Sequence, residues 1–115
     1  MHEIQEALGE LWNAVERLRA VRDGEQLNGF LAGLAPETEF AVIKLQAGIK
    51  TLLPEPSGKV QTALEVAERI EKTAFDMWAK RDATLLPGVL TRWADEITLS
   101  LRSIYRLLNI NSPTV

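Results

Sequence analysis

Apolar side chains recur every three or four residues along most of the chain, and this spacing limits the possible folds more than any other feature. The first stretch carries them at Ile4, Leu8, Leu11, Val15 and Leu18. Steps of four and three residues place side chains on one face of an α-helix. No stretch alternates apolar and polar residues in the way that a half-buried β-strand does. The chain is therefore predicted to be all-α.

Proline and glycine divide this pattern into separate helices. The expected long helices span residues 3–22, 36–53, 59–81 and 85–109. Between the first two we expect a short helical segment at 25–34, weakened by its glycines. Pro36 suits the first turn of the second helix. Ser57 is a candidate N-cap of the third helix, and Asp82 or Thr84 is a candidate N-cap of the fourth.

The length of these helices determines how they must be arranged. Each is roughly 30 Å long, whereas a compact chain of 115 residues has a radius of gyration of about 13 Å. The helices must therefore lie side by side, and the short links make neighbours antiparallel. Acidic residues lie nearer the start of each helix and basic residues nearer its end, so antiparallel neighbours bring opposite charges together. We predict an antiparallel four-helix bundle formed by a single domain at residues 1–110, with a disordered tail at 111–115.

The apolar stripes also predict which aromatic side chains fill the core. Phe75 and Trp78 continue the stripe of the third helix, whereas Leu86 and Trp93 belong to that of the fourth. Trp12 lies at the edge of the first stripe, where packing on a neighbouring helix is favoured over anchoring a partner.

Two helix positions leave alternatives open. Gly48 lies on the same side as Leu45, and it either permits a close helix crossing or is a tolerated imperfection. Glu71 flanks the stripe of the third helix. Its carboxylate either reaches water, which is favoured, or is buried and paired with an arginine of another helix or subunit.

The sequence offers no set of residues that points to catalysis. It contains no cysteine and a single histidine, His2, which we expect to be solvated. No Glu-x-x-His motif of a di-iron bundle is present. Glu65 and Glu68 are interleaved with basic residues, as is typical of a solvated helix face rather than a metal site. We therefore expect a non-enzymatic protein without a metal or cofactor.

A second apolar stripe on the second helix is the strongest candidate for a binding surface. Its members are Phe40, Ile43 and Ala47, nearly opposite the stripe that includes Leu45. A helix that is apolar on two sides must be covered on two sides. Phe40→Asp is expected to be costly, because it places a charge in an apolar contact, and we expect it to dissociate an oligomer.

Two arrangements would cover this second stripe. Segment 25–35 either folds back and covers it with Leu27, Phe30 and Leu31, or the stripe contacts a partner or a neighbouring subunit. The candidate partner-binding residues are Phe40, Ile43, Ala47, Leu27, Phe30 and Trp12.

The expected function is that of a protein-interaction module, namely an assembly subunit, an adaptor or a small chaperone. The expected partner is another protein or a second copy of the chain, with a dimer as the expected oligomer. One alternative is a nucleoprotein subunit that contacts phosphates through Arg92, Arg102 and Arg106, although the net charge of −3 disfavours nucleic acid. A second alternative is a ligand sensor with an apolar pocket inside the bundle.

The same sequence predicts where the protein is found. No apolar run approaches the roughly 20 residues of a membrane-spanning helix, and the first residues are acidic rather than signal-like. We expect a cytoplasmic protein without a membrane partner.

Overall fold

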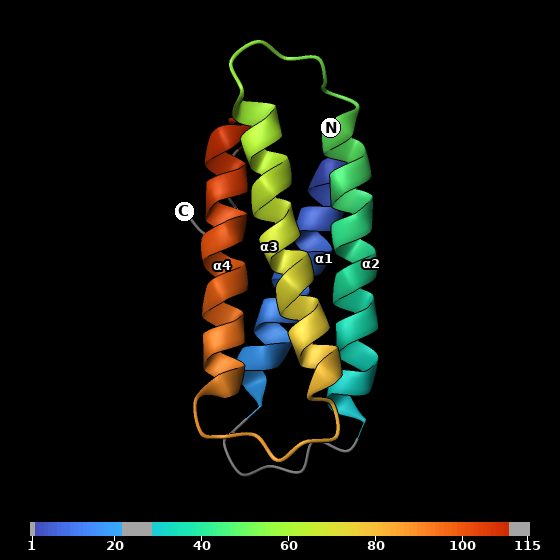
Figure 1. The fold of residues 1–115 in the computed structure, drawn as a ribbon, viewed down its shortest axis with the longest axis vertical. Helices are drawn as coiled ribbons and strands as arrows, with labels where there is room; N and C mark the ends of the chain where they lie inside the picture. The colour runs from blue at the N-terminus through green and yellow to red at the C-terminus, as the bar shows by residue number, and fades with distance from the viewer. Residues whose placement is uncertain (1, 22–28, 111–115) are drawn as a thin grey trace.

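The computed structural model describes residues 2–21 and 29–110, which form four α-helices and no strand (Figure 1). The helices are α1 His2–Ala20, α2 Phe30–Lys50, α3 Lys59–Ala79 and α4 Val89–Leu107. They stand side by side, and each runs antiparallel to the neighbour that follows it (Figure 1). The contacts join α1 to α2, α2 to α3, α3 to α4 and α4 back to α1. The predicted all-α, antiparallel four-helix bundle is confirmed.

Helix α2 begins earlier than the sequence suggested. Residues 30–34, expected in a separate short segment, form the start of α2, and Pro36 lies inside the helix instead of in its first turn. A proline inside a helix costs about 3 kcal/mol, because it removes a hydrogen bond and crowds the preceding turn. Leu31 and Leu34 are fully buried on the core side of α2, and their burial offsets this cost. Residues 25–28 of the expected segment and the expected tail lie outside the described residues.

Glycine, rather than Ser57, Asp82 or Thr84, precedes the helices α3 and α4. Gly58 and Gly88 are the N-cap residues, with φ angles of 81° and 85°, and neither helix has a side-chain cap. Such a left-handed conformation is open to glycine at little cost. The Oγ of Ser57 nevertheless accepts a hydrogen bond of 3.2 Å from the backbone N–H of Lys59.

The core confirms part of the expected aromatic packing. Trp93 is fully buried, as predicted. Phe75 and Trp78 were expected in the core, but they are about half exposed, and Met77 is fully buried in their place. Met77 lies two helical turns after Ile70 and therefore faces the core as Ile70 does. Phe75 and Trp78 lie outside the core-facing side of α3.

Leu86 was expected on the core stripe of the fourth helix, but it lies in the link before α4 and is largely exposed. Helix α4 begins only at Val89, after Pro87 and Gly88. A side chain in the link does not follow the helical period, so its spacing from Leu90 has no bearing on the core.

Gly48 lies where α1 and α2 approach each other closely. A Cβ atom added at Gly48 would lie 2.8 Å from Cγ1 of Ile4, a separation that real Cβ atoms do not adopt. Of the two interpretations left open by the sequence, the close crossing of α1 and α2 at Gly48 is therefore the correct one.

Candidate functional site

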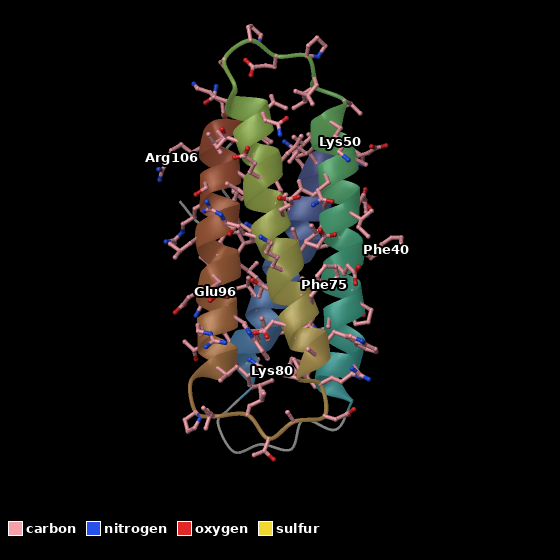
Figure 2. All side chains as sticks on the ribbon, viewed as in Figure 1. Phe40, Lys50, Phe75, Lys80, Glu96 and Arg106 are labelled. Carbon is pink, nitrogen blue, oxygen red and sulfur yellow. The ribbon has the colours of Figure 1, made fainter. Side chains whose placement is uncertain are left out.

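The second apolar stripe of α2 is exposed to solvent. Phe40 is 71% exposed, Ile43 is 50% exposed, and Ala47 is also exposed. Figure 2 shows Phe40 projecting from the side of α2 that faces away from the other helices. We call Phe40, Ile43 and Ala47 the α2 outer face. It is the candidate site because large apolar side chains gather there on a helix whose other side already forms the core.

The described part of the expected covering segment, residues 29–35, does not cover the α2 outer face. Leu31, expected to lie over it, is instead fully buried in the core on the opposite side of the same helix. Phe30 is half-buried against that core, and Leu27 lies outside the described residues. Residues 30–35 are part of α2 itself, so they cannot fold back on it, and the expected cover by Phe30 and Leu31 was wrong.

A groove between α1 and α2 adjoins this face. Its volume is about 750 Å³, and it opens to solvent. Gly9 and Asn13 of α1 and Pro36 and Phe40 of α2 are among its lining residues. A Cβ atom added at Gly9 would meet no atom within 4 Å, which shows how open the α1 side is. Phe40 is therefore both part of the α2 outer face and one wall of the groove.

Ion pairs between α1 and α2 hold the two sides of this groove together. Nζ of Lys44 lies 2.9 Å from a carboxylate oxygen of Glu10 and 3.2 Å from one of Glu6. The hydrogen bonds to Glu10 and Glu6 raise the pKa of Lys44. Arg17 pairs with Glu37 at the other end. These contacts bring acidic and basic helix segments together, as the charge pattern predicted.

Trp12 lies apart from the α2 outer face. It is half-buried, and its Nε1–H donates a hydrogen bond of 3.0 Å to the hydroxyl of Tyr105 on α4. The two rings stack with centroids 6.5 Å apart. Burial raises the pKa of Tyr105 more than this hydrogen bond lowers it. The structure thus places Trp12 in contact with α4, where it packs as a flank residue.

The three arginines of α4 do not form an uninterrupted basic surface. Arg92 lies 3.7 Å from a carboxylate oxygen of Asp76 and 3.8 Å from one of Glu96. Arg102 and Arg106 are exposed, and Figure 2 shows Arg106 projecting away from α4. The acidic neighbours of Arg92 offset its charge, which leaves two arginines for a phosphate backbone.

Asp76 forms a polar cluster that the sequence reading did not identify. Its carboxylate accepts a hydrogen bond of 2.9 Å from Nε1–H of the buried Trp93 and lies 3.2 Å from Nζ of Lys80. Partial burial raises the pKa of Asp76, but the hydrogen bonds from Trp93 and Lys80 and the charges of Lys80 and Arg92 lower it more, so the pKa lies below its ordinary value of 3.8. The spacing of Asp76 and Lys80 indicated their ion pair, but no sequence signal pointed to Trp93.

The low pKa of Asp76 makes stability depend on pH. The Asp76 carboxylate binds a proton more readily in the unfolded chain than in the folded one. Its contribution to the free energy of unfolding is therefore complete above its ordinary pKa of 3.8, and it is lost as the pH falls through the lower pKa of the folded chain. Asp76→Asn retains an oxygen acceptor for Trp93 but does not titrate there. We therefore expect wild type to be the more stable chain near neutral pH, and the two to converge in acid.

Urea unfolding of wild type and Asp76→Asn, measured in steps from about pH 7 to about pH 2, checks this expectation. A difference in the free energy of unfolding that stays constant over the whole range would show that Asp76 does not titrate as described.

A smaller groove between α2 and α3 is lined by Glu71. It has a volume of about 240 Å³, and most of its other lining side chains are polar or charged, including Lys50, Glu65 and Glu68. Glu71 is half-buried and forms no ion pair with another described residue, in agreement with the favoured flank position. Within the described part of the chain, no three histidine, aspartate or glutamate side chains are grouped closely enough to hold a metal ion.

The chain matches no protein-family model, no curated protein and no solved structure. None of the four helices of the described residues combines the length and the apolar character that crossing a bilayer requires.

Proposed function

We propose that the protein is a non-enzymatic interaction module that binds another protein chain through the α2 outer face. The exposure of Phe40 and Ile43 carries this proposal. Burial of apolar surface lowers the free energy by about 25 cal/mol per Å². Two adjacent large apolar side chains in solvent therefore favour association with a partner that buries them. Leu99 on α4 is also exposed, but it stands among polar and charged neighbours, as single surface leucines often do. Phe75 and Trp78 on α3 are half exposed as well, but a guanidinium covers the Trp78 ring.

The shape and chemistry of the face favour a protein over a nucleic acid or a small molecule. Ile43 and Ala47 lie along the outside of a helix and line neither of the two grooves described above, whereas small ligands bind in concave sites. The adjoining groove is lined by Glu6, Glu10 and Glu37, which are paired with Lys44 and Arg17, so it offers no surplus of positive charge to a phosphate. An apolar helix face with a polar surround suits the matching face of another folded chain.

Assembly subunits, adaptors and small chaperones all act by association, and the proposal covers these three roles. In each of them Phe40 would be buried only in the complex. The bundle supplies a rigid support, because the opposite side of α2 is packed into the core through Leu45 and Ile49. The face is thus presented without any rearrangement of the fold.

Photo-crosslinking tests the proposal directly. A photoreactive amino acid is introduced in place of Phe40, and the chain is irradiated in an extract of the cells that make it. The control carries the same amino acid in place of Leu99, which has a similar exposed fraction (64%) on a different helix. We expect a discrete crosslinked protein from position 40 and little from position 99. Equal, diffuse crosslinking from both positions would refute a protein-binding role for the α2 outer face.

A further inference from the structure

The side-chain sizes and charges along the α2 outer face are complementary to those of a second copy of the same face that runs in the opposite direction. On the basis of the proposed function, we infer that its partner is a second copy of the chain, which packs antiparallel along α2 about a twofold axis close to Ile43. Three observations support this arrangement: the order of large and small apolar residues, the order of charges, and the absence of ion pairs at those charges.

The first observation is the order of side-chain sizes. Phe40 and Ala47 are two turns apart on the same side of α2, with Ile43 between them. If the twofold axis passes between positions 43 and 44, position 40 of one chain faces position 47 of the other. Each Phe40 then lies against the partner's Ala47, a large side chain against a small one, and the two Ile43 side chains meet near the axis. This is the alternation that closely packed helices require.

The second observation is the order of charges along the edge of the face. Glu39 and Lys50 are eleven residues apart, about three helical turns, so they lie on one side of α2. In the antiparallel pair Glu39 faces position 48, which is about 3 Å along the helix from Lys50. The long lysine side chain spans that offset. The twofold axis repeats the contact, giving two Glu39–Lys50 pairs, whereas a parallel pair would place Glu39 beside Glu39.

The third observation is that these two charges form no ion pair with another described residue, although Lys50 also lines the α2–α3 groove with Glu65 and Glu68. Glu39 is half-buried, and Lys50 is exposed. Lys44, in contrast, is already paired with Glu6 and Glu10. The edge of the face thus carries one acidic and one basic group in the order that a reversed copy complements. A twofold interface requires this self-complementarity, because the same patch contributes both sides.

Disulfide crosslinking tests the position of the axis, and the natural chain simplifies it because it contains no cysteine. We expect purified Ile43→Cys to form a disulfide-linked dimer rapidly under mild oxidation, because the two residues meet near the axis. Leu99→Cys is the control, with an exposed fraction of 64% against 50% for Ile43. We also expect a mixture of Phe40→Cys and Ala47→Cys to give more mixed dimer than either variant gives alone.

A charge exchange tests the direction of packing. Glu39→Lys and Lys50→Glu each place like charges opposite one another at two symmetric sites. We expect each single variant to raise the dissociation constant of the dimer about fivefold or more, measured by sedimentation equilibrium at low salt. The double variant carries both exchanges and restores opposite charges, so its dissociation constant should return toward the wild-type value.

These outcomes separate the inference from the proposed function. The inference is overturned if Ile43→Cys crosslinks no faster than Leu99→Cys, or if the double charge variant is as weak as the single ones. If photo-crosslinking from position 40 captures a different protein while the purified chain stays a single copy, the second copy is excluded and the proposed function stands. If position 40 crosslinks nothing, both are excluded.

Discussion

Replacing Trp93 with alanine is expected to lower the free energy of unfolding by about 3–5 kcal/mol. Trp93 is the largest of the fully buried side chains, so its removal leaves a cavity in the core. The variant also removes the hydrogen bond from Nε1–H of Trp93 to Asp76, which leaves this partly buried carboxylate with fewer donors. Both losses act on the contact between α3 and α4.

The matched control is Trp78→Ala, which removes the same side chain from a site that is 44% exposed. Trp78 stacks on the guanidinium of Arg81, 4.0 Å from the ring centroid, a contact of about 0.5–1 kcal/mol at an exposed site. We expect Trp78→Ala to cost about 1 kcal/mol. Urea unfolding followed by circular dichroism measures both variants. Equal losses would contradict the placement of Trp93 inside and Trp78 at the surface.

Gly48→Ala is expected to destabilise the bundle, although alanine is the better helix former. Alanine favours an isolated helix by about 1 kcal/mol over glycine. At Gly48, however, the added Cβ would lie 2.8 Å from Cγ1 of Ile4, so the Ile4 side chain or the two helices must shift. Overpacking of this kind costs about 1–3 kcal/mol, which outweighs the gain in helix propensity.

Gly9→Ala is the control of opposite sign. Gly9 also lies inside a helix, but a Cβ atom added there meets nothing within 4 Å. Its replacement is therefore expected to stabilise the chain by about 0.5–1 kcal/mol. Thermal and urea unfolding of both variants measure the difference. If Gly48→Ala were as stabilising as Gly9→Ala, the close crossing at Ile4 would be wrong.

The number and direction of the helices could be predicted from the sequence because they depend on periodicity and link length alone. The steps from Ile4 to Leu18 define one continuous buried face, and each member of that stripe is buried. Charges followed the same logic: Arg17 near the end of α1 meets Glu37 near the start of α2. These features need no knowledge of how the helices pack in detail.

Helix ends and stripe edges could not be predicted, because tertiary packing decides them. Pro36 locally favours a helix start, yet the burial of Leu31 and Leu34 draws the start of α2 back to Phe30. At the end of α3, the spacing predicted Phe75 and Trp78 as the last core positions, and Met77 was missed. The neighbouring helices bury Met77, which lies two helical turns after Ile70 on the same side of α3.

The sequence predicted the residues of the candidate site but not what covers them. Apolar residues on two sides of α2 predicted that Phe40 and Ile43 need a cover, but a pattern within one helix cannot say which segment supplies it. The structure excludes residues 30–35, because they belong to α2. The contact of Trp12 with Tyr105 likewise depends on the order of helices around the bundle, which no local pattern determines.

The size of the complex in an extract of the producing cells tests most directly whether the protein acts through the α2 outer face. Wild type, Phe40→Asp and Leu99→Asp are compared by native sizing. Both variants should unfold within about 0.5 kcal/mol of wild type, because both side chains are exposed. For the isolated chain, this replaces the costly Phe40→Asp substitution that the sequence predicted, since Phe40 contacts no covering segment among the described residues. We expect wild type and Leu99→Asp to migrate in a complex larger than one chain, and Phe40→Asp to migrate as a single chain. Identical migration of all three proteins would contradict a role for Phe40 in association.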